Sequence, residues 1–188
     1  MSQDTIEVVR TPLRAGERSR RTLDQRLLLR FPRLAATLNR LVGRLPPGSR
    51  LRQAMLVRGL RLAAEAYNRL DLDAVVIGWR SDFEYYPARN LVDAGLSEPC
   101  YRGLSGYRAY VAASAEIWGD ETRFDPTEVI DLGDRVVVLA NAPLRAQASG
   151  VPLTLEFAYV ATLEDGRVTR QQEFHDHQEA LEAVGLRK

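Results

Sequence analysis

The chain has 188 residues, of which 45% are hydrophobic, enough for one globular domain with a substantial core. It contains no apolar run near the roughly 18 residues of a membrane-spanning helix, and its opening MSQDTIEVVR lacks the apolar stretch of a secretory signal, so we expect a cytoplasmic protein with no integral membrane segment. The single cysteine, Cys100, excludes an internal disulfide and a thiolate metal site.

The charge is distributed unevenly along the chain. Residues 1–61 hold 14 arginines against 4 acidic residues, a balance of +10, whereas the rest of the chain balances to −9. Such a basic arm either contacts a polyanion, such as nucleic acid or an anionic membrane surface, or lies on its own acidic body or on a partner subunit. The second interpretation is favoured, because the arm lacks the interleaved aromatic residues of a single-strand binder.

The arginine-rich part of the chain is predicted to be mainly helical. Residues 1–21 are polar and are expected to form a loose or partly helical lead. From Leu23, apolar residues recur at spacings of three and four, which predicts an amphipathic helix that Pro32 kinks or divides. We expect its apolar face to cover a patch of the same protein, with a membrane surface as the alternative. PPGS ends this segment, and Ser49 is placed to cap a long helix that reaches Leu70.

The middle of the chain mixes short elements. Residues 71–78 are predicted as a short helix, 81–87 as a strand, 88–104 as a long loop and 106–118 as a helix with apolar and tyrosine residues at helical spacing.

An antiparallel meander closes the chain. Four strands are predicted, at residues 122–132, 135–148, 151–163 and 168–175. The dipeptides GD, SG and DG between them indicate tight hairpin turns. A last helix begins at Asp176, which forms a capping pair with Glu179, and it ends at Gly185. Helices followed by a meander and one helix predict an α+β domain with helices against one face of a curved sheet.

The last two thirds of the chain contain five segments in a characteristic order: AAEAYNRLDLDAVV, YRGLSGYRAYV, VIDLGDRVVVLA, TLEDGRVTR and FHDHQEALEAVGL. In this order they resemble the nuclear-transport-factor-2-like superfamily, and within it the SnoaL-like relatives of polyketide cyclases. The resemblance implies a cone-shaped, curved antiparallel sheet with helices packed on its concave face, a mostly apolar pocket and a homodimer. It assigns residues 51–188 to this domain and leaves 1–50 as an arginine-rich, mainly helical extension.

The hairpin turns predict which strand residues face one another. With two-residue turns, Glu173 lies opposite Ala158, His175 opposite Glu156, and Asn141 opposite Ala158. One face of the sheet then has a polar centre made by Asn141, Glu156, Glu173 and His175. A slip of one residue would exchange the faces. The opposite face is expected to carry the following residues: Ala142, Leu144, Leu155, Phe157, Tyr159, Val168 and Phe174.

The polar face has two interpretations. The pattern alone favours a solvated face, because the aromatic residues gather on the other side. The resemblance implies a concave face instead: Glu173 matches the acid–base aspartate of the cyclases, and Asn141 stands where epoxide hydrolases of the superfamily carry a second aspartate. The cyclase pattern His-Trp-Asp reads QQE at 171–173, and the hydrolase pattern Arg-x-Asp reads LAN at 139–141, so epoxide opening is not expected.

Glu173 is the candidate acid–base residue. A carboxylate buried among apolar groups can hold or release a proton near neutral pH, and with His175 and Asn141 it would suit proton abstraction next to a carbonyl. Asn141, Tyr85 or Tyr67 would hold the enolate oxygen. The ligand-binding candidates are the following: Tyr67, Trp79, Tyr85, Glu156, Leu139 and Gln171.

Three functions stay open at this point. The first is binding of a small, largely apolar molecule, with cyclase- or isomerase-type proton transfer by Glu173. The second is a non-catalytic dimeric binding or assembly module, in which Glu173 pairs with Arg145 or Arg170 or faces solvent. The third is an adaptor whose residues 1–61 contact nucleic acid or a membrane surface.

No metal or cofactor is expected. Zinc needs at least three protein ligands, Asp176 is used as a helix cap, and His177 is expected to face water. The sequence also lacks a glycine-rich phosphate loop.

Overall fold

The computed structural model describes residues 8–14, 16, 20–118, 123–145 and 152–186. The helices are α1 (Leu23–Arg30), α2 (Pro32–Gly43), α3 (Arg50–Tyr67), α4 (Leu72–Val75), α5 (Arg89–Asp93), α6 (Gly103–Trp118) and α7 (His177–Ala183), with a short 3-10 turn η1 (Val76–Gly78). The strands are β1 (Val9–Pro12), β2 (Trp79–Tyr86), β3 (Tyr101–Arg102), β4 (Asp125–Asp131), β5 (Arg135–Arg145), β6 (Pro152–Glu164) and β7 (Arg167–Phe174).

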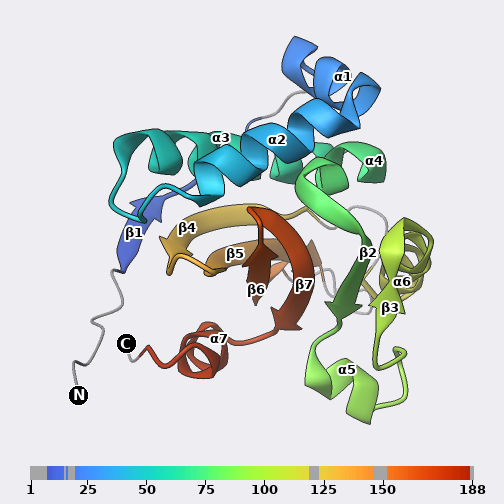
Figure 1. Cartoon of the computed structure of the whole chain (residues 1–188). Helices are drawn as coiled ribbons and strands as arrows, with labels where there is room; N and C mark the ends of the chain where they lie inside the picture. Colours follow the sequence, from blue (N-terminus) through green and yellow to red (C-terminus); the bar gives the residue numbers. More distant parts are fainter. Residues whose placement is uncertain (1–7, 15, 17–19, 119–122, 146–151, 187–188) are drawn as a thin grey trace.

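These strands form one curved sheet in the order β1-β4-β5-β6-β7-β2-β3 (Figure 1). All neighbours are antiparallel except β2 and β7, which run parallel. The predicted meander is therefore present as β4 to β7. The predicted α+β class and curved sheet are confirmed, and the parallel pair is an addition that brings β2 next to the last strand.

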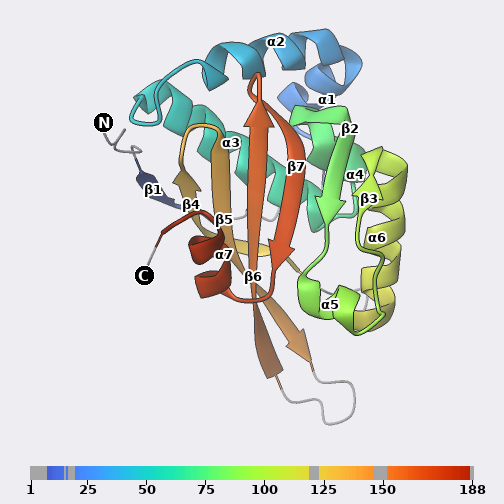
Figure 2. The same cartoon turned by 60° about the horizontal axis from the view of Figure 1, so that its bottom comes forward.

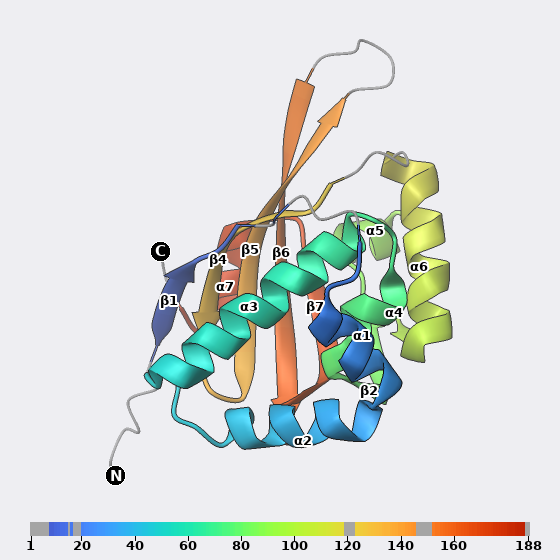
Figure 3. The ribbon, with the colours of Figure 1, turned by 90° about the horizontal axis from the view of Figure 1, so that it is seen from above.

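The helices lie in separate layers around the sheet. α3, α4 and α6 cover its concave face, whereas α7 covers the convex face (Figures 2 and 3). On the concave side, Leu56 and Leu60 of α3 pack against Val136 and Val138 of β5. On the convex side, Leu181 of α7 packs in a cluster whose other members are the following: Ile130, Leu132, Val137, Leu139, Ala158, Val160, Ala180 and Val184.

Several predicted helix boundaries are confirmed. α1 ends at Arg30 and α2 begins at Pro32, whose ring occupies the first helical turn, where a missing N–H costs nothing. The Ser49 side chain caps α3 by accepting from the Arg52 amide at 3.5 Å. Asp176 caps α7 by accepting from the Glu179 amide at 3.0 Å.

A buried ion pair ties the N-terminal helices to the sheet. The Arg52 guanidinium donates to both carboxylate oxygens of Asp131 at 2.7 Å, and both side chains are buried. The same guanidinium donates to the carbonyls of Gly43, Leu45 and Gly133. One side chain therefore joins the end of α2, the loop before α3 and the β4–β5 turn.

Two predictions about short elements are wrong. Residues 9–12 were expected in a loose lead but form the edge strand β1, which pairs with β4 from Val9↔Asp131 to Pro12↔Glu128. Residues 88–104 were expected as a loop but contain α5 and β3. Elements this short carry little periodicity of their own, and the neighbouring strands supply the hydrogen bonds that define them.

The predicted register between β6 and β7 is wrong by one residue. Glu164 lies opposite Arg167, as a two-residue turn requires, and Leu163 lies opposite Val168. Thr162, however, lies opposite Arg170, so Thr169 is an extra residue and forms a β-bulge. Beyond the bulge Tyr159, rather than Ala158, lies opposite Glu173, which places Glu173 on the face of Tyr159.

The register between β5 and β6 differs by two residues from the prediction. Asn141 lies opposite Glu156 and Leu139 opposite Ala158. A shift of two leaves the faces unchanged, because side chains alternate along a strand. The turn predicted at Ser149 and Gly150 lies outside the described residues. Asn141 and Glu156 therefore share one face of the sheet, as predicted. Glu173 lies on the other face because of the extra residue in β7.

Candidate functional site

Glu173 lies on the concave face with its side chain fully buried. The hydroxyls of Tyr85 and Tyr110 both donate to its Oε2. His175 Nε2 lies 2.7 Å from its Oε1, and Asn90 Nδ2 lies 3.2 Å from His175 Nδ1. An amide that donates to Nδ1 leaves the proton on Nε2, so His175 donates to the carboxylate.

These donors come from parts of the chain that are far apart in sequence. Tyr85 reaches the site because β2 runs parallel to β7, with Tyr85 opposite Gln171, and residues two apart in a strand share a face. Tyr110 comes from α6, and its ring lies 4.4 Å from that of Tyr85. His175 follows β7 directly, and its ring meets that of Phe157 edge-on at 4.9 Å.

The prediction that Glu173 pairs with an arginine or faces solvent is wrong. Its partners are two tyrosines and one histidine, and Arg170 instead lies over the Tyr86 ring at 4.1 Å. A buried carboxylate that accepts from uncharged donors is an unusual feature in a domain of this size, because buried acids are ordinarily paired with cations.

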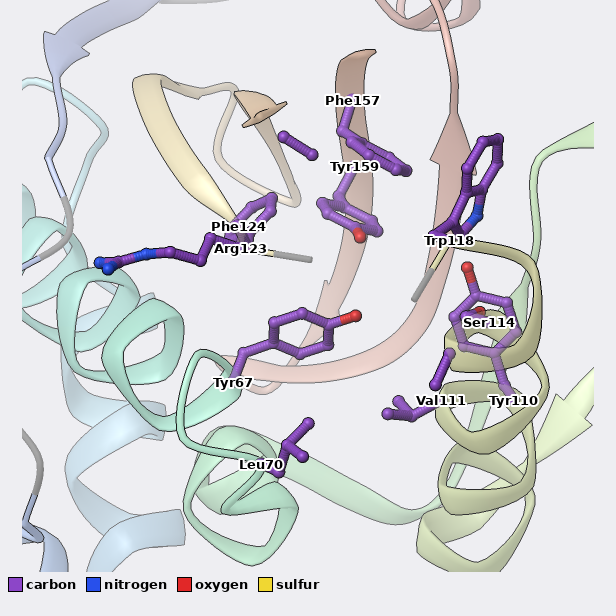
Figure 4. Close-up of a pocket in the computed structure, with 12 residues that line it drawn as sticks. Tyr67, Leu70, Tyr110, Val111, Ser114, Trp118, Arg123, Phe124, Phe157 and Tyr159 are labelled. Carbon is purple, nitrogen blue, oxygen red and sulfur yellow. The ribbon is translucent and has the colours of Figure 1, made fainter. Parts of the chain in front are cut away.

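Two adjoining cavities lie beside this cluster, of about 50 Å³ and about 130 Å³. Tyr67, Phe124 and Tyr159 line both of them. The smaller one is also lined by Tyr110, whose hydroxyl bonds to Glu173, and by Ser114 (Figure 4). The larger one is apolar and lies between α3 and the concave face; its other lining residues include the following: Leu13, Leu56, Leu60, Val75, Trp79, Val136, Val138 and Gln171.

The tyrosine hydroxyls around the cavities stay protonated at neutral pH. Burial, and then the charge of Glu173, raises the pKa of Tyr67 to about 12. The same two causes hold the pKa values of Tyr85, Tyr110 and Tyr159 well above the ordinary range. These groups therefore act as hydrogen-bond donors near pH 7.

Some of these hydroxyls are available to a ligand. Those of Tyr67 and Tyr159 make no hydrogen bond with the described residues, and Figure 4 shows both pointing into the space between α6 and the sheet. Ser114 Oγ is buried beside the Tyr110 hydroxyl. A small oxygen-bearing molecule would find the two tyrosine donors here.

The structure brings together some of the predicted site residues. Glu173, His175 and Tyr85 form one hydrogen-bonded cluster. Tyr67 lines both cavities, and the larger one also contacts the following predicted residues: Trp79 and Gln171.

The other predicted site residues lie on the convex face. Asn141 lies opposite Glu156, and Leu139 packs under α7. The Glu156 carboxylate accepts from the His177 amide at 3.5 Å and is more than half exposed. The alternation of side chains along β5 and β6 keeps all three away from Glu173, so the predicted convergence of Asn141 and Glu156 with Glu173 is wrong.

Tyr110, Tyr159 and Ser114 were not among the predicted site residues. Tyr110 and Ser114 occur at helical spacing on one face of α6, a pattern that by itself indicates only a buried helix face. Tyr159 was assigned to the opposite face from Glu173 because the bulge at Thr169 was not foreseen. The available signal was a run of tyrosines on a helix face that meets a sheet carrying a buried acid.

The two residues after His175 have structural roles. Asp176 caps α7, and His177 Nε2 lies 2.9 Å from the carbonyl oxygens of both Ala140 and Phe157. His177 therefore fastens α7 to the sheet, and the prediction that it faces water is wrong. Among the residues that the structure describes, no group of three His, Cys, Asp or Glu side chains could hold a metal ion. Within the same ranges, every helix is too short or too polar to cross a bilayer.

A model of the SnoaL-like domain family matches residues 60–171, which leaves α1, α2 and the first half of α3 outside the match. Among solved structures, TerC co-crystallised with polyporic acid is 24% identical with a TM-score of 0.56, over 68% of this chain and 96% of that chain. An NTF2-like protein of unknown function from Burkholderia pseudomallei is 26% identical with a TM-score of 0.54, over 68% and 95%. A SnoaL-like protein of unknown function from Burkholderia thailandensis is 21% identical with a TM-score of 0.51, over 66% and 97%. A comparison with curated proteins found no match.

Proposed function

The chain belongs to the SnoaL-like domain family, and from this premise we propose that it binds a small, largely apolar ligand between α3, α6 and the sheet and moves a proton on that ligand. The observation that carries the proposal is the pairing of Tyr110 with Glu173. The Tyr110 side chain lines a cavity, and its hydroxyl donates to a carboxylate that is fully buried behind it.

The cavities limit the size and polarity of the ligand. Apolar protein cavities of about 150 Å³ bind a benzene-sized molecule. The larger cavity has about 130 Å³ and an apolar lining, and it adjoins the smaller one along Tyr67 and Tyr159. A compound with one ring in the apolar part and one carbonyl oxygen near the tyrosine hydroxyls fits this arrangement.

The tyrosines suit the stabilisation of an enolate. The hydroxyls of Tyr67 and Tyr159 would donate to the carbonyl oxygen and stabilise the negative charge that develops there. The proton on the carbon next to the carbonyl would pass to the Tyr110 oxygen, while the Tyr110 proton passes to Glu173. In an isomerisation the proton then returns through Tyr110 to another carbon of the ligand. In a ring closure the enolate carbon instead bonds to the carbon of a second carbonyl group of the ligand, and the proton passes to the oxygen of that carbonyl.

Tyr85 and His175 would be positioning residues in this scheme. Each donates to the Glu173 carboxylate without lining the smaller cavity. They would fix the position of the carboxylate behind Tyr110.

The test is proton exchange at the carbon next to the carbonyl of monocyclic ketones, followed by NMR in deuterated water, with binding measured by saturation transfer. We expect exchange with the native protein and a loss of about 100-fold or more in Glu173→Gln and in Tyr110→Phe, since positioned acid–base groups contribute roughly this much. Glu156→Gln, on the convex face, is the matched control and should exchange normally. If the native protein binds the ketones without exchange, the proposed proton transfer is wrong. If it binds none of them, both the proposed ligand class and the proton transfer are wrong.

One observation favours a second candidate, a non-catalytic binding or assembly module. Three protein donors already satisfy the Glu173 carboxylate, as expected for a residue that only holds α6 against the sheet. In that case Glu173→Gln would lower stability and no ketone would exchange. The homodimer stays a prediction that sedimentation equilibrium would check.

A further inference from the structure

The helices α1 and α2 expose an apolar stripe. Its members are between 37% and 83% exposed and recur at spacings of three and four residues; they are the following: Leu23, Leu27, Phe31, Leu34, Leu38 and Leu41. The side chains that α1 and α2 turn toward the protein are instead Gln25 and Ala35, which are buried, and Leu29, which is partly buried against the core. The prediction that the apolar face covers the protein's own surface is therefore wrong for this stripe.

Unpaired arginines accompany the stripe. Arg26, Arg30, Arg33 and Arg44 are exposed and make no ion pair with the described residues. Asp24 is the only acidic residue on the two helices, and it is paired with Arg58 at 2.6 Å. No aspartate or glutamate occurs from residue 25 to residue 64. The surface is thus both apolar and strongly cationic.

Hydrogen bonds and a close backbone approach attach α2 to the body of the protein. Arg52 binds the carbonyls at the end of α2 and Asp131 of the sheet. At the middle of α2, a Cβ on Gly166 would overlap the carbonyl oxygen of Asn39, so the helix lies directly on the β6–β7 turn. Figure 2 shows α2 as the outermost layer at this end of the molecule.

We propose that α1 and α2 dock on the surface of an anionic lipid bilayer. Leucine and phenylalanine side chains beside arginines match the interfacial region, where apolar groups enter the acyl boundary and guanidinium groups bind lipid phosphates. A second copy of the chain could bury the leucine side chains, but it would place the unpaired arginines of the two copies close together, where they repel one another. Nucleic acid would match the arginines but would leave the leucines in contact with phosphate and water, and Phe31 is the only aromatic residue available for stacking.

The test is co-sedimentation of the full chain with vesicles of phosphatidylcholine alone and with vesicles that also contain phosphatidylglycerol. We expect binding to the anionic vesicles only, weakened by salt. Two variants separate the contributions: Leu34→Gln/Leu38→Gln/Leu41→Gln and Arg26→Gln/Arg30→Gln/Arg33→Gln/Arg44→Gln. The arginine variant should bind at least about 100-fold more weakly, since each of its four interfacial arginines contributes on the order of 1 kcal/mol and about 1.4 kcal/mol is tenfold in affinity. The leucine variant should bind at least about tenfold more weakly, because it removes apolar side chains that would enter the acyl boundary.

Matched controls lie at the far end of the molecule. Leu96→Gln and Arg89→Gln replace exposed residues near α5 and should bind as the native chain does. Circular dichroism confirms that each variant is folded, as expected because none of the replaced side chains is buried. Binding that survives in both multiple variants would overturn the proposal, as would a failure of the native chain to bind. A dimer that only the leucine variant dissociates, without vesicle binding, would assign the stripe to a second copy instead.

Discussion

The Tyr110 hydroxyl on α6 donates to Oε2 of Glu173 on β7, and the two residues are 63 positions apart. The Tyr85 hydroxyl, on β2, donates to the same oxygen. A single carboxylate oxygen therefore joins a helix of the concave layer to two adjacent strands of the sheet. Any change at Glu173 is expected to alter both the chemistry of the cavity and the packing of α6.

Tyr85→Phe should lower the free energy of unfolding by about 1–3 kcal/mol, because it removes a donor from a buried carboxylate. Tyr159→Phe is the control, since the Tyr159 hydroxyl has no hydrogen-bond partner within the described residues; its effect should lie within about 0.5 kcal/mol of zero. Urea unfolding of both variants measures the difference. Equal losses would mean that the bond between Tyr85 and Glu173 contributes nothing.

The stability should fall steeply as the pH rises above 10. Burial raises the pKa of Tyr67 to about 12 and those of Tyr85, Tyr107, Tyr110 and Tyr159 well above 10. Above pH 10 the unfolded chain releases these protons and the native chain keeps them, so the stabilisation present at lower pH is lost. Each such tyrosine contributes about 1.4 kcal/mol per pH unit until its native pKa is reached.

Urea midpoints at a series of pH values, read together with tyrosinate absorbance, test this dependence. Tyrosinate should appear only as the protein unfolds. In Tyr67→Phe, the free energy of unfolding should fall less steeply between about pH 10 and pH 12, by the contribution of one tyrosine. Ionisation of the buried tyrosines without unfolding would contradict the expected order of events.

Arg52→Met should cost about 3–5 kcal/mol, because it leaves the buried Asp131 carboxylate without its charged partner. Arg58→Met is the matched control. It removes an exposed arginine that pairs with Asp24, and such pairs contribute about 0–1 kcal/mol. Thermal unfolding of both variants gives the comparison. A double variant, Arg52→Met/Asp131→Leu, should recover part of the loss, and no recovery would mean that the carbonyl contacts of Arg52 matter more than its charge.

Gly166→Ala should destabilise the protein more than Gly95→Ala does. Both glycines have a positive φ, of 71° and 69°, which costs an alanine about 1–2 kcal/mol. A Cβ at Gly95 meets open space, whereas at Gly166 it overlaps Asn39 of α2. The difference between the two unfolding free energies therefore isolates the close approach of α2 to the β6–β7 turn. Equal effects would mean that α2 shifts without cost.

Much of the fold follows from local signals in the sequence. Pro32 divides α1 from α2, Ser49 caps α3 and Asp176 caps α7, since each residue satisfies or removes a backbone group at a helix end. The meander follows from alternating runs separated by turn dipeptides. Glu173 and its contact with His175 could also be anticipated, because they lie two residues apart at the end of a strand.

The rest depends on tertiary contacts that carry no local signal. β1 is a strand because β4 offers a free edge. Tyr110 belongs to the site because α6 packs against β2 and β3, which lets the Tyr110 hydroxyl reach Glu173 of β7. The exposure of Leu34 and Leu38 could not be foreseen, because periodicity defines an apolar face without saying what covers it. The prediction that Asn141 and Glu173 share a face of the sheet is wrong because of the irregularity in β7.

The extra residue at Thr169 determines which face of the sheet a side chain at a given distance from the turn occupies, and it places the Glu173 carboxylate on the concave face. Beyond the bulge, from Arg170 to Glu173, a residue added or removed would reverse the direction in which the carboxylate points. Deleting Thr169 itself would only remove the bulge, and Glu173 would stay opposite Tyr159 and keep facing the cavity. A relative without the extra threonine would therefore carry the equivalent acid one position closer to the turn. Acids in this strand should be compared between relatives by the residue of β6 that lies opposite them, rather than by distance from the turn or by the letters that surround them.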